Sequence, residues 1–276
     1  MGTSQSSKGP ASNISLVPPW VDDVPELPPA DVLPDDTASP EQHGAPAADQ
    51  VDTNQVAPPA RFAAARTNIG SFTRNGLSTT MRRGVGQYVR NGYGGSATIT
   101  RRMAGTARTA GALDGILRTG TLPDGSRIAD QILSSGGDVN AVLDAIVNSA
   151  RPSDGSQDAE STRHSVRDAL SDLLARFPDA NLAELTDAER SFVIERYAAL
   201  DVFGRFCLDM QGTIMDKAAD PATGLIRLRQ IRDYIASTVR DAFQKLRDQG
   251  RATTGNVAAL TRGALAETFR VFEEYL

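Results

Sequence analysis

The chain of 276 residues has very few of the side chains that build common catalytic and metal centres. Cys207 is its single cysteine, so no internal disulfide can form, which is typical of a protein from a reducing compartment. This thiol and the two histidines, His43 and His164, provide fewer ligands than the usual structural zinc site requires. Cys207 lies on an apolar stripe and is interpreted as a buried, inert thiol. We therefore expect no enzymatic activity and no cofactor bound by this chain itself.

Long apolar runs are missing as well. No stretch approaches membrane-spanning length, and the N-terminus lacks a basic region followed by an apolar one. These two features predict a cytoplasmic protein without a membrane partner. The residues Met1–Ser6 do match the myristoylation pattern, but one acyl chain binds membranes only marginally and the acidic segment behind it supplies no second signal.

Two successive segments each nearly lack charge of one sign: the first has almost no basic residues, and the second has no acidic ones. Residues 1–60 contain nine Asp and Glu against Lys8 alone, and eleven of the fifteen prolines. Such a composition buries too little apolar surface to offset the entropy of ordering, so 1–60 is predicted to be a long disordered, Pro-rich acidic tail. Residues 53–113 contain no Asp or Glu. They carry nine arginines, which form the predicted basic surface: Arg61, Arg66, Arg74, Arg82, Arg83, Arg90, Arg101, Arg102 and Arg108.

The arginine-rich region 61–109 allows several interpretations. Its interleaved aromatic residues, Phe62, Phe72, Tyr88 and Tyr93, would let it hold a nucleic-acid backbone and stack bases. Arginine forks equally suit an acidic protein partner, or the acidic tail of this same chain. A merely solvated surface is the third interpretation. We favour the protein partner or the tail over nucleic acid.

From residue 61 onward, apolar residues recur at three- and four-residue steps, and no alternating strand pattern occurs. A capping box at Thr186–Glu189 and the pair Asp220–Pro221 mark two helix starts. The predicted fold class is all-α: a helical domain preceded by the tail. Within it we expect an Arg-rich helical segment, 61–118, and an α-helical bundle, 119–276, that together form one compact unit.

One further helix is expected to begin at a Ser96 cap and to continue through Leu117. Its three glycines, Gly105, Gly111 and Gly115, are expected to let a second helix approach closely, although each weakens the helix by roughly 1 kcal/mol relative to alanine.

The first twenty residues contain the only tryptophan of the chain, next to two prolines. An aromatic anchor in a segment that cannot fold alone indicates recognition by another protein. Methionine removal is efficient before glycine, so the mature chain is expected to start with the small, mobile amine of Gly2. The predicted partner-binding residues are Thr3, Ser4, Gly9, Pro10, Pro18, Pro19 and Trp20.

Two blocks of this sequence resemble the QatB family of the bacterial Qat anti-phage defence system. The first block is Met1–Pro10 with Leu16–Trp20, and the second is Pro59–Arg66 followed by Tyr88–Gly95. The resemblance covers the N-terminal segment and residues 59–103 best, whereas the C-terminal helices are compatible but generic.

The resemblance implies a protein without catalytic activity that acts beside an ATPase, a QueC-like enzyme and a TatD-like nuclease. QueC-like enzymes use ATP, with zinc as a second candidate cofactor, and activate a deazaguanine carboxylate. In a defence system such an enzyme could attach that acid to a protein amine, and Gly2 is the best acceptor in this chain. Two hypotheses thus stay open: a modifiable substrate and adaptor of a defence complex, or a nucleic-acid-binding helical module that uses 61–109.

Overall fold

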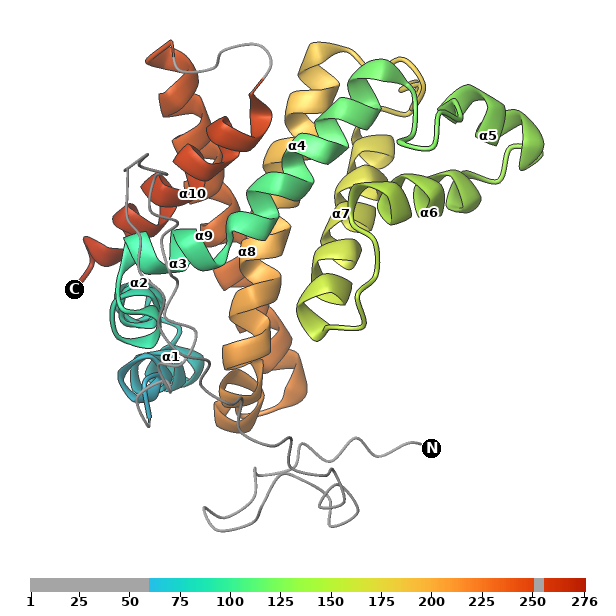
Figure 1. Cartoon of the computed structure of the whole chain (residues 1–276). Helices are drawn as coiled ribbons and strands as arrows, with labels where there is room; N and C mark the ends of the chain where they lie inside the picture. Colours follow the sequence, from blue (N-terminus) through green and yellow to red (C-terminus); the bar gives the residue numbers. More distant parts are fainter. Residues whose placement is uncertain (1–59, 251–255) are drawn as a thin grey trace, which may run out of the picture. The chain divides into compact units, whose positions relative to one another are not determined.

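Helix α8 is the longest element and lies at the centre of the fold. It runs from Asp187 to Lys217, roughly 46 Å at 1.5 Å per residue. The predicted capping box is present: the Thr186 hydroxyl accepts from the Glu189 backbone N–H, and the Glu189 carboxylate accepts from the Thr186 N–H. In this computed structural model α8 packs against α4, α7 and α9 (Figure 1).

The structure describes residues 60–250 and 256–276, and in these ranges the chain forms ten α-helices and no β-strand. The predicted all-α fold is therefore confirmed, whereas the predicted tail up to residue 59 lies outside the described residues. A π-helical turn, Tyr88–Gly92, follows the second helix. The helices other than α8 are α1 (Ala63–Asn75), α2 (Ser78–Gln87), α3 (Ser96–Arg102), α4 (Ala104–Thr119), α5 (Ile128–Ser134), α6 (Val139–Ala150), α7 (Gln157–Arg176), α9 (Pro221–Asp248) and α10 (Val257–Glu273).

Buried apolar side chains form one continuous core that extends from Phe62 to Phe272. Helix α10 closes one side of it by packing against α2, α3, α4 and α9. Asp220 caps α9 through the Thr223 N–H, with Pro221 in its first turn as predicted. Among the helices that the structure describes, none combines the length and apolarity needed to cross a membrane.

The predicted helix from Ser96 to Leu117 is divided in two. Helix α3 ends at Arg102 and α4 begins at Ala104, because Met103 leaves helical geometry with ψ at 21°. Gly95, with a φ of 104°, takes the cap position that the sequence assigned to Ser96, and no side-chain cap bond forms there. On the two sides of this break, α3 packs on α10, whereas α4 packs on both α10 and α8.

Only one of the three glycines predicted to admit a neighbouring helix does so. A Cβ atom on Gly111 would lie 3.1 Å from the Cβ of Ala258, at the start of α10. Around Gly105 and Gly115 there is no neighbouring atom within 4 Å, so the expected close approach is wrong at these two positions.

Position 92 requires a glycine, because a Cβ atom there would overlap the Phe62 ring. Gly92→Ala is expected to destabilise the protein by about 1–3 kcal/mol through overpacking. Gly105→Ala is the matched control, because its Cβ meets open space and a better helix former should leave stability unchanged or raise it by up to about 1 kcal/mol. Urea unfolding of both variants measures the difference, and equal stabilities would contradict this packing.

Candidate functional site

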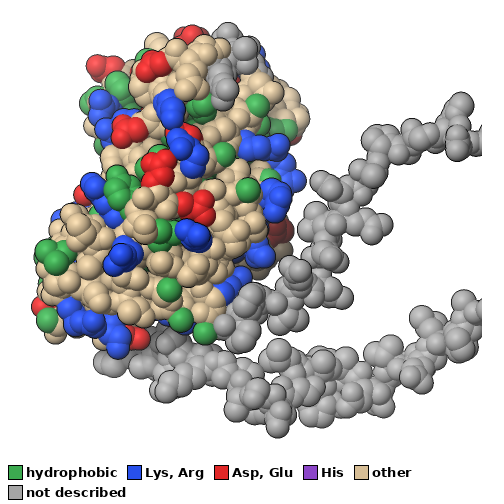
Figure 2. Space-filling view, turned by 90° about the vertical axis from the view of Figure 1, so that its left-hand side faces the viewer, with side chains coloured by type: hydrophobic (Ala, Val, Ile, Leu, Met, Phe, Trp, Pro, Cys, Tyr) green, Lys and Arg blue, Asp and Glu red, His purple; other side chains and the backbone are tan. Residues whose placement is uncertain are grey.

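The nine arginines of the predicted basic surface lie on α1, α2, the π-helical turn, α3 and α4, with Arg61 just before α1. Seven of them are exposed, whereas Arg61 and Arg82 are half-buried. None forms an ion pair with a carboxylate of the described residues, in contrast to most arginines after residue 113. Figure 2 looks onto the side that carries α1, α2 and α10, and shows Lys and Arg side chains in several clusters there. The predicted basic surface therefore carries charge that the described residues do not neutralise by pairing.

The aromatic residues between these arginines do not form a base-stacking platform. Phe62, Phe72, Tyr88 and Tyr93 are 7%, 1%, 3% and 5% exposed. Their rings fill the core: Phe62 stacks on Tyr88 with centroids 5.6 Å apart, and Tyr88 meets Phe206 of α8 edge to face at 5.2 Å. The expectation that they stack nucleic-acid bases is wrong, because apolar periodicity at this spacing marks the buried face of these helices.

Tyr88 and Tyr93 share one acceptor on α8. Both hydroxyls donate to the same carboxylate oxygen of Asp209, at 2.9 and 2.7 Å. Burial raises the pKa of both phenols, so both stay protonated as donors at neutral pH. Asp209 thus holds the π-helical turn and the Gly-rich loop after it onto α8.

The Tyr93 hydroxyl connects this cluster to a cleft between α4, α7 and α8. It accepts a hydrogen bond from Arg205 Nε at 2.8 Å, and Arg205 also pairs with Asp158 of α7. The guanidinium carbons of Arg61, Arg102 and Arg205 lie 5.6, 5.8 and 5.9 Å from the centre of the Tyr93 ring. Three positive groups therefore surround one ring at the end of the cleft.

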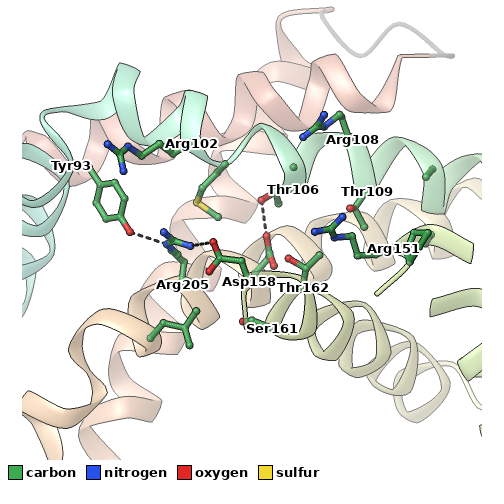
Figure 3. Close-up of a pocket in the computed structure, with 17 residues that line it drawn as sticks. Tyr93, Arg102, Thr106, Arg108, Thr109, Arg151, Asp158, Ser161, Thr162 and Arg205 are labelled. Carbon is green, nitrogen blue, oxygen red and sulfur yellow. Dashed lines mark hydrogen bonds and ion pairs between the residues drawn. The ribbon is translucent and has the colours of Figure 1, made fainter. Parts of the chain in front are cut away.

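The cleft is bounded by α4, α7, α8 and the end of α6, and has a volume of about 510 Å³. Arg102 and Arg108 lie on the α3–α4 side, and Arg151 follows α6. Besides the Tyr93 hydroxyl, the cleft is lined by the hydroxyl groups of Thr106, Thr109, Ser161 and Thr162. Figure 3 shows Arg205 and Arg151 on either side of Thr162 in that view. The lining carries four guanidinium groups, and two carboxylates, Asp158 and Asp201.

Asp201 is the least expected residue of this lining. It comes from the core-facing side of α8, is 6% exposed, and accepts a 2.6 Å hydrogen bond from Thr106. Burial raises the pKa of its carboxyl, against the Thr106 hydroxyl, which lowers it. One helical turn earlier, the buried Tyr197 hydroxyl has no hydrogen-bond partner among the described residues.

Sequence reasoning missed this cleft. The available signal was a charged residue, Asp201, one turn after Tyr197 within the apolar stripe of α8. Its partner Thr106 is 95 residues away in the sequence, and no periodic pattern predicts that pairing.

Cys207 and His164, two further sequence candidates that the structure describes, do not line the cleft. Gly2 and the seven predicted partner-binding residues of the N-terminal segment, Thr3 to Trp20, lie outside the described residues. Cys207 is half-buried, and burial raises the pKa of its thiol to about 12, so it is an unreactive thiol at neutral pH. His164 is exposed on α7. In the described ranges, no group of three His, Cys, Asp or Glu side chains is placed to hold a metal ion.

A family model described as Qat anti-phage system associated protein QatB matches residues 94–272, more than half of the chain. The match runs from the loop after the π-helical turn into α10 and contains every cleft residue except Tyr93. It thus extends over the helices whose sequence looked generic, beyond the two N-terminal blocks that carried the resemblance. No curated protein matches the chain, and no solved structure does.

Proposed function

The chain belongs to the QatB family of the Qat anti-phage system, and from this premise we propose that it is the protein substrate and adaptor of a QueC-like enzyme of that system. In this proposal the helical part binds a partner, and the N-terminal segment presents the Gly2 amine for modification. The ATPase and the TatD-like nuclease of the system are further candidate partners.

The observation that carries the adaptor role is the unpaired basic surface. Arg66 and Arg74 project from α1, and both are exposed without an ion pair to any carboxylate of the described residues. Folding alone gains little from such a concentration of one charge, whereas an acidic surface on a partner would neutralise it and speed association. The surface also belongs to the part of the chain that directly follows the N-terminal segment, so binding here would hold that segment near the partner.

The acceptor role of Gly2 follows from amine chemistry. An α-amine has a reference pKa near 8, whereas a lysine amine lies near 10.4, so the α-amine of Gly2 is far more often neutral at pH 7 than Lys8. Only the neutral amine is nucleophilic. With the carboxylate activated as an adenylate by ATP, the Gly2 nitrogen attacks the carboxyl carbon, an amide bond forms, AMP leaves and the amine releases one proton. Glycine has no Cβ to crowd this tetrahedral intermediate.

Reversal of charge on the basic surface tests the adaptor role. The double variant Arg66→Glu/Arg74→Glu is expected to bind the QueC-like enzyme at least tenfold more weakly, with the smaller salt dependence that loss of two charge contacts produces. The control, Arg240→Glu/Arg262→Glu, makes the same change in net charge at exposed positions on α9 and α10, where the described residues again offer no ion pair. Biolayer interferometry at two salt concentrations measures both. Equal weakening in the two double variants would show a nonspecific charge effect and remove the proposed surface.

A nucleic-acid-binding module is the second candidate function, and the same unpaired arginines favour it. Because Phe62, Phe72, Tyr88 and Tyr93 are buried, such binding would rest on phosphate contacts alone, and it would be weak and strongly salt-dependent. A single-stranded oligonucleotide added to the same interferometry experiment distinguishes the two functions. If the chain is a nucleic-acid-binding module, the oligonucleotide displaces the QueC-like enzyme from it. If the chain is an adaptor, the enzyme stays bound.

A further inference from the structure

The cleft between α4, α7 and α8 has the character of a small-ligand site, and we propose that it binds a phosphorylated small molecule of nucleotide size. Its volume of about 510 Å³ lies within the range of small-molecule sites. All the lining residues that the proposal uses lie between Tyr93 and Leu208, so it stands or falls independently of Gly2 modification.

The positive charge of the lining selects an anion. Arg102 and Arg108 are exposed and form no ion pair with a carboxylate of the described residues. Arg205 is held in place by Tyr93 and Asp158, and Arg151 pairs with the loop residue Asp154 at 2.8 Å. The cleft therefore combines two guanidinium groups without a carboxylate partner and two that are already oriented. Guanidinium forks bind phosphate oxygens in pairs, which makes a phosphate group the fitting anion.

The hydroxyl groups argue for an organic ligand rather than a bare inorganic ion. Thr109, Ser161 and Thr162 offer both donors and acceptors, and a free phosphate would occupy only a fraction of the volume. Sugar hydroxyls and ring nitrogens are the groups that such a lining can hydrogen-bond. A nucleotide joins these groups to a phosphate at the right size.

Asp201 gives the cleft an additional polar contact on its buried side. Asp201 lines the cleft, is 6% exposed as a residue, and accepts a hydrogen bond from Thr106. Burial raises the pKa of this carboxyl, and its oxygens can accept a hydrogen bond from a ligand hydroxyl. Polar groups buried with few partners are costly, so a ligand hydroxyl bound here would stabilise Asp201.

Isothermal titration calorimetry on the full chain tests the proposal with four probes: ATP, AMP, inorganic phosphate and adenosine. We expect ATP or AMP to bind, phosphate to bind at least tenfold more weakly, and adenosine not to bind. Arg108→Gln and Arg151→Gln should each weaken nucleotide binding by about tenfold, the effect of losing one charged hydrogen bond. Asp201→Asn keeps a hydrogen-bonding side chain of the same size at this position and should retain binding, whereas Asp201→Leu should lose it.

Arg240→Gln, at an exposed position on α9 away from the cleft, is the control and should bind like the wild type. Because Arg108 is exposed, its replacement leaves the fold intact, and circular dichroism verifies this for every variant. The absence of binding by both nucleotides would overturn the proposal, as would unchanged affinity in Arg108→Gln and Arg151→Gln. Binding of a single-stranded oligonucleotide with the same arginine dependence, but of neither nucleotide, would assign the cleft to a polymer and overturn it too.

Discussion

Gly2→Pro is expected to abolish N-terminal modification by the QueC-like enzyme. The substitution replaces a primary amine by a hindered secondary amine in a ring, which cannot easily attack a carboxyl carbon in a confined site. The helical part of the chain is untouched, so binding to the enzyme should remain within about threefold of wild type. Mass spectrometry of the N-terminal peptide after incubation with enzyme and ATP measures modification, and interferometry measures binding.

Gly2→Ala is the matched control for this variant. It retains a primary α-amine and adds only a methyl group, so modification should continue at a reduced rate. Trp20→Ala should instead weaken docking, while modification recovers at high enzyme concentration because the amine is unchanged. Full modification of Gly2→Pro, or transfer of the modification to Lys8, would contradict the assignment of the Gly2 amine as the acceptor.

Asp209→Ala is expected to cause the largest loss of stability among the variants considered. It removes the common acceptor of Tyr88 and Tyr93, whose rings are 3% and 5% exposed. Each buried hydroxyl without an acceptor costs about 1–3 kcal/mol, so the free energy of unfolding should fall by about 2–6 kcal/mol for the two. For a domain of this size the Tm should fall by roughly 4–24 °C. Differential scanning calorimetry measures both.

Asp216→Ala provides the control, because Asp216 is exposed on the same helix and makes no ion pair within the described residues. A second experiment isolates the cause. In the Asp209→Ala background, Tyr88→Phe removes one unsatisfied hydroxyl, so it should cost much less there than in the wild type, and the double-mutant cycle gives the coupling. Additive effects of the two substitutions would show that the hydrogen bonds do not explain the loss.

Local signals in the sequence predicted the helices well. The capping residues Thr186 and Asp220 act within three residues of the chain, so their role is visible in the sequence. The divided helix at Met103 was missed because the break serves packing on α10 and α8, which are far away in sequence. The same spacing that revealed the apolar stripes also placed Phe72 and Tyr88 on buried faces, which the base-stacking interpretation overlooked.

The two candidate sites also differ in whether the sequence alone reveals them. The basic surface was visible as a run of arginines without acidic residues, because charge composition is a property of the sequence. The cleft was not, since its floor joins Thr106 and Asp201 across 95 residues, and its end joins Tyr93 to Arg205 across 112. Such contacts are set by how α4, α7 and α8 pack, and only the folded chain shows them.

The central claim is that the Gly2 amine is the substrate of a partner enzyme, and one measurement tests it most directly. The wild-type protein is produced with and without the neighbouring QueC-like enzyme, and its intact mass and N-terminal peptide are compared. The proposal predicts an added group on the Gly2 nitrogen, joined by an amide bond, only when the enzyme and ATP are present. An unmodified Gly2 amine in the active defence complex would contradict it and leave this chain a scaffolding role alone.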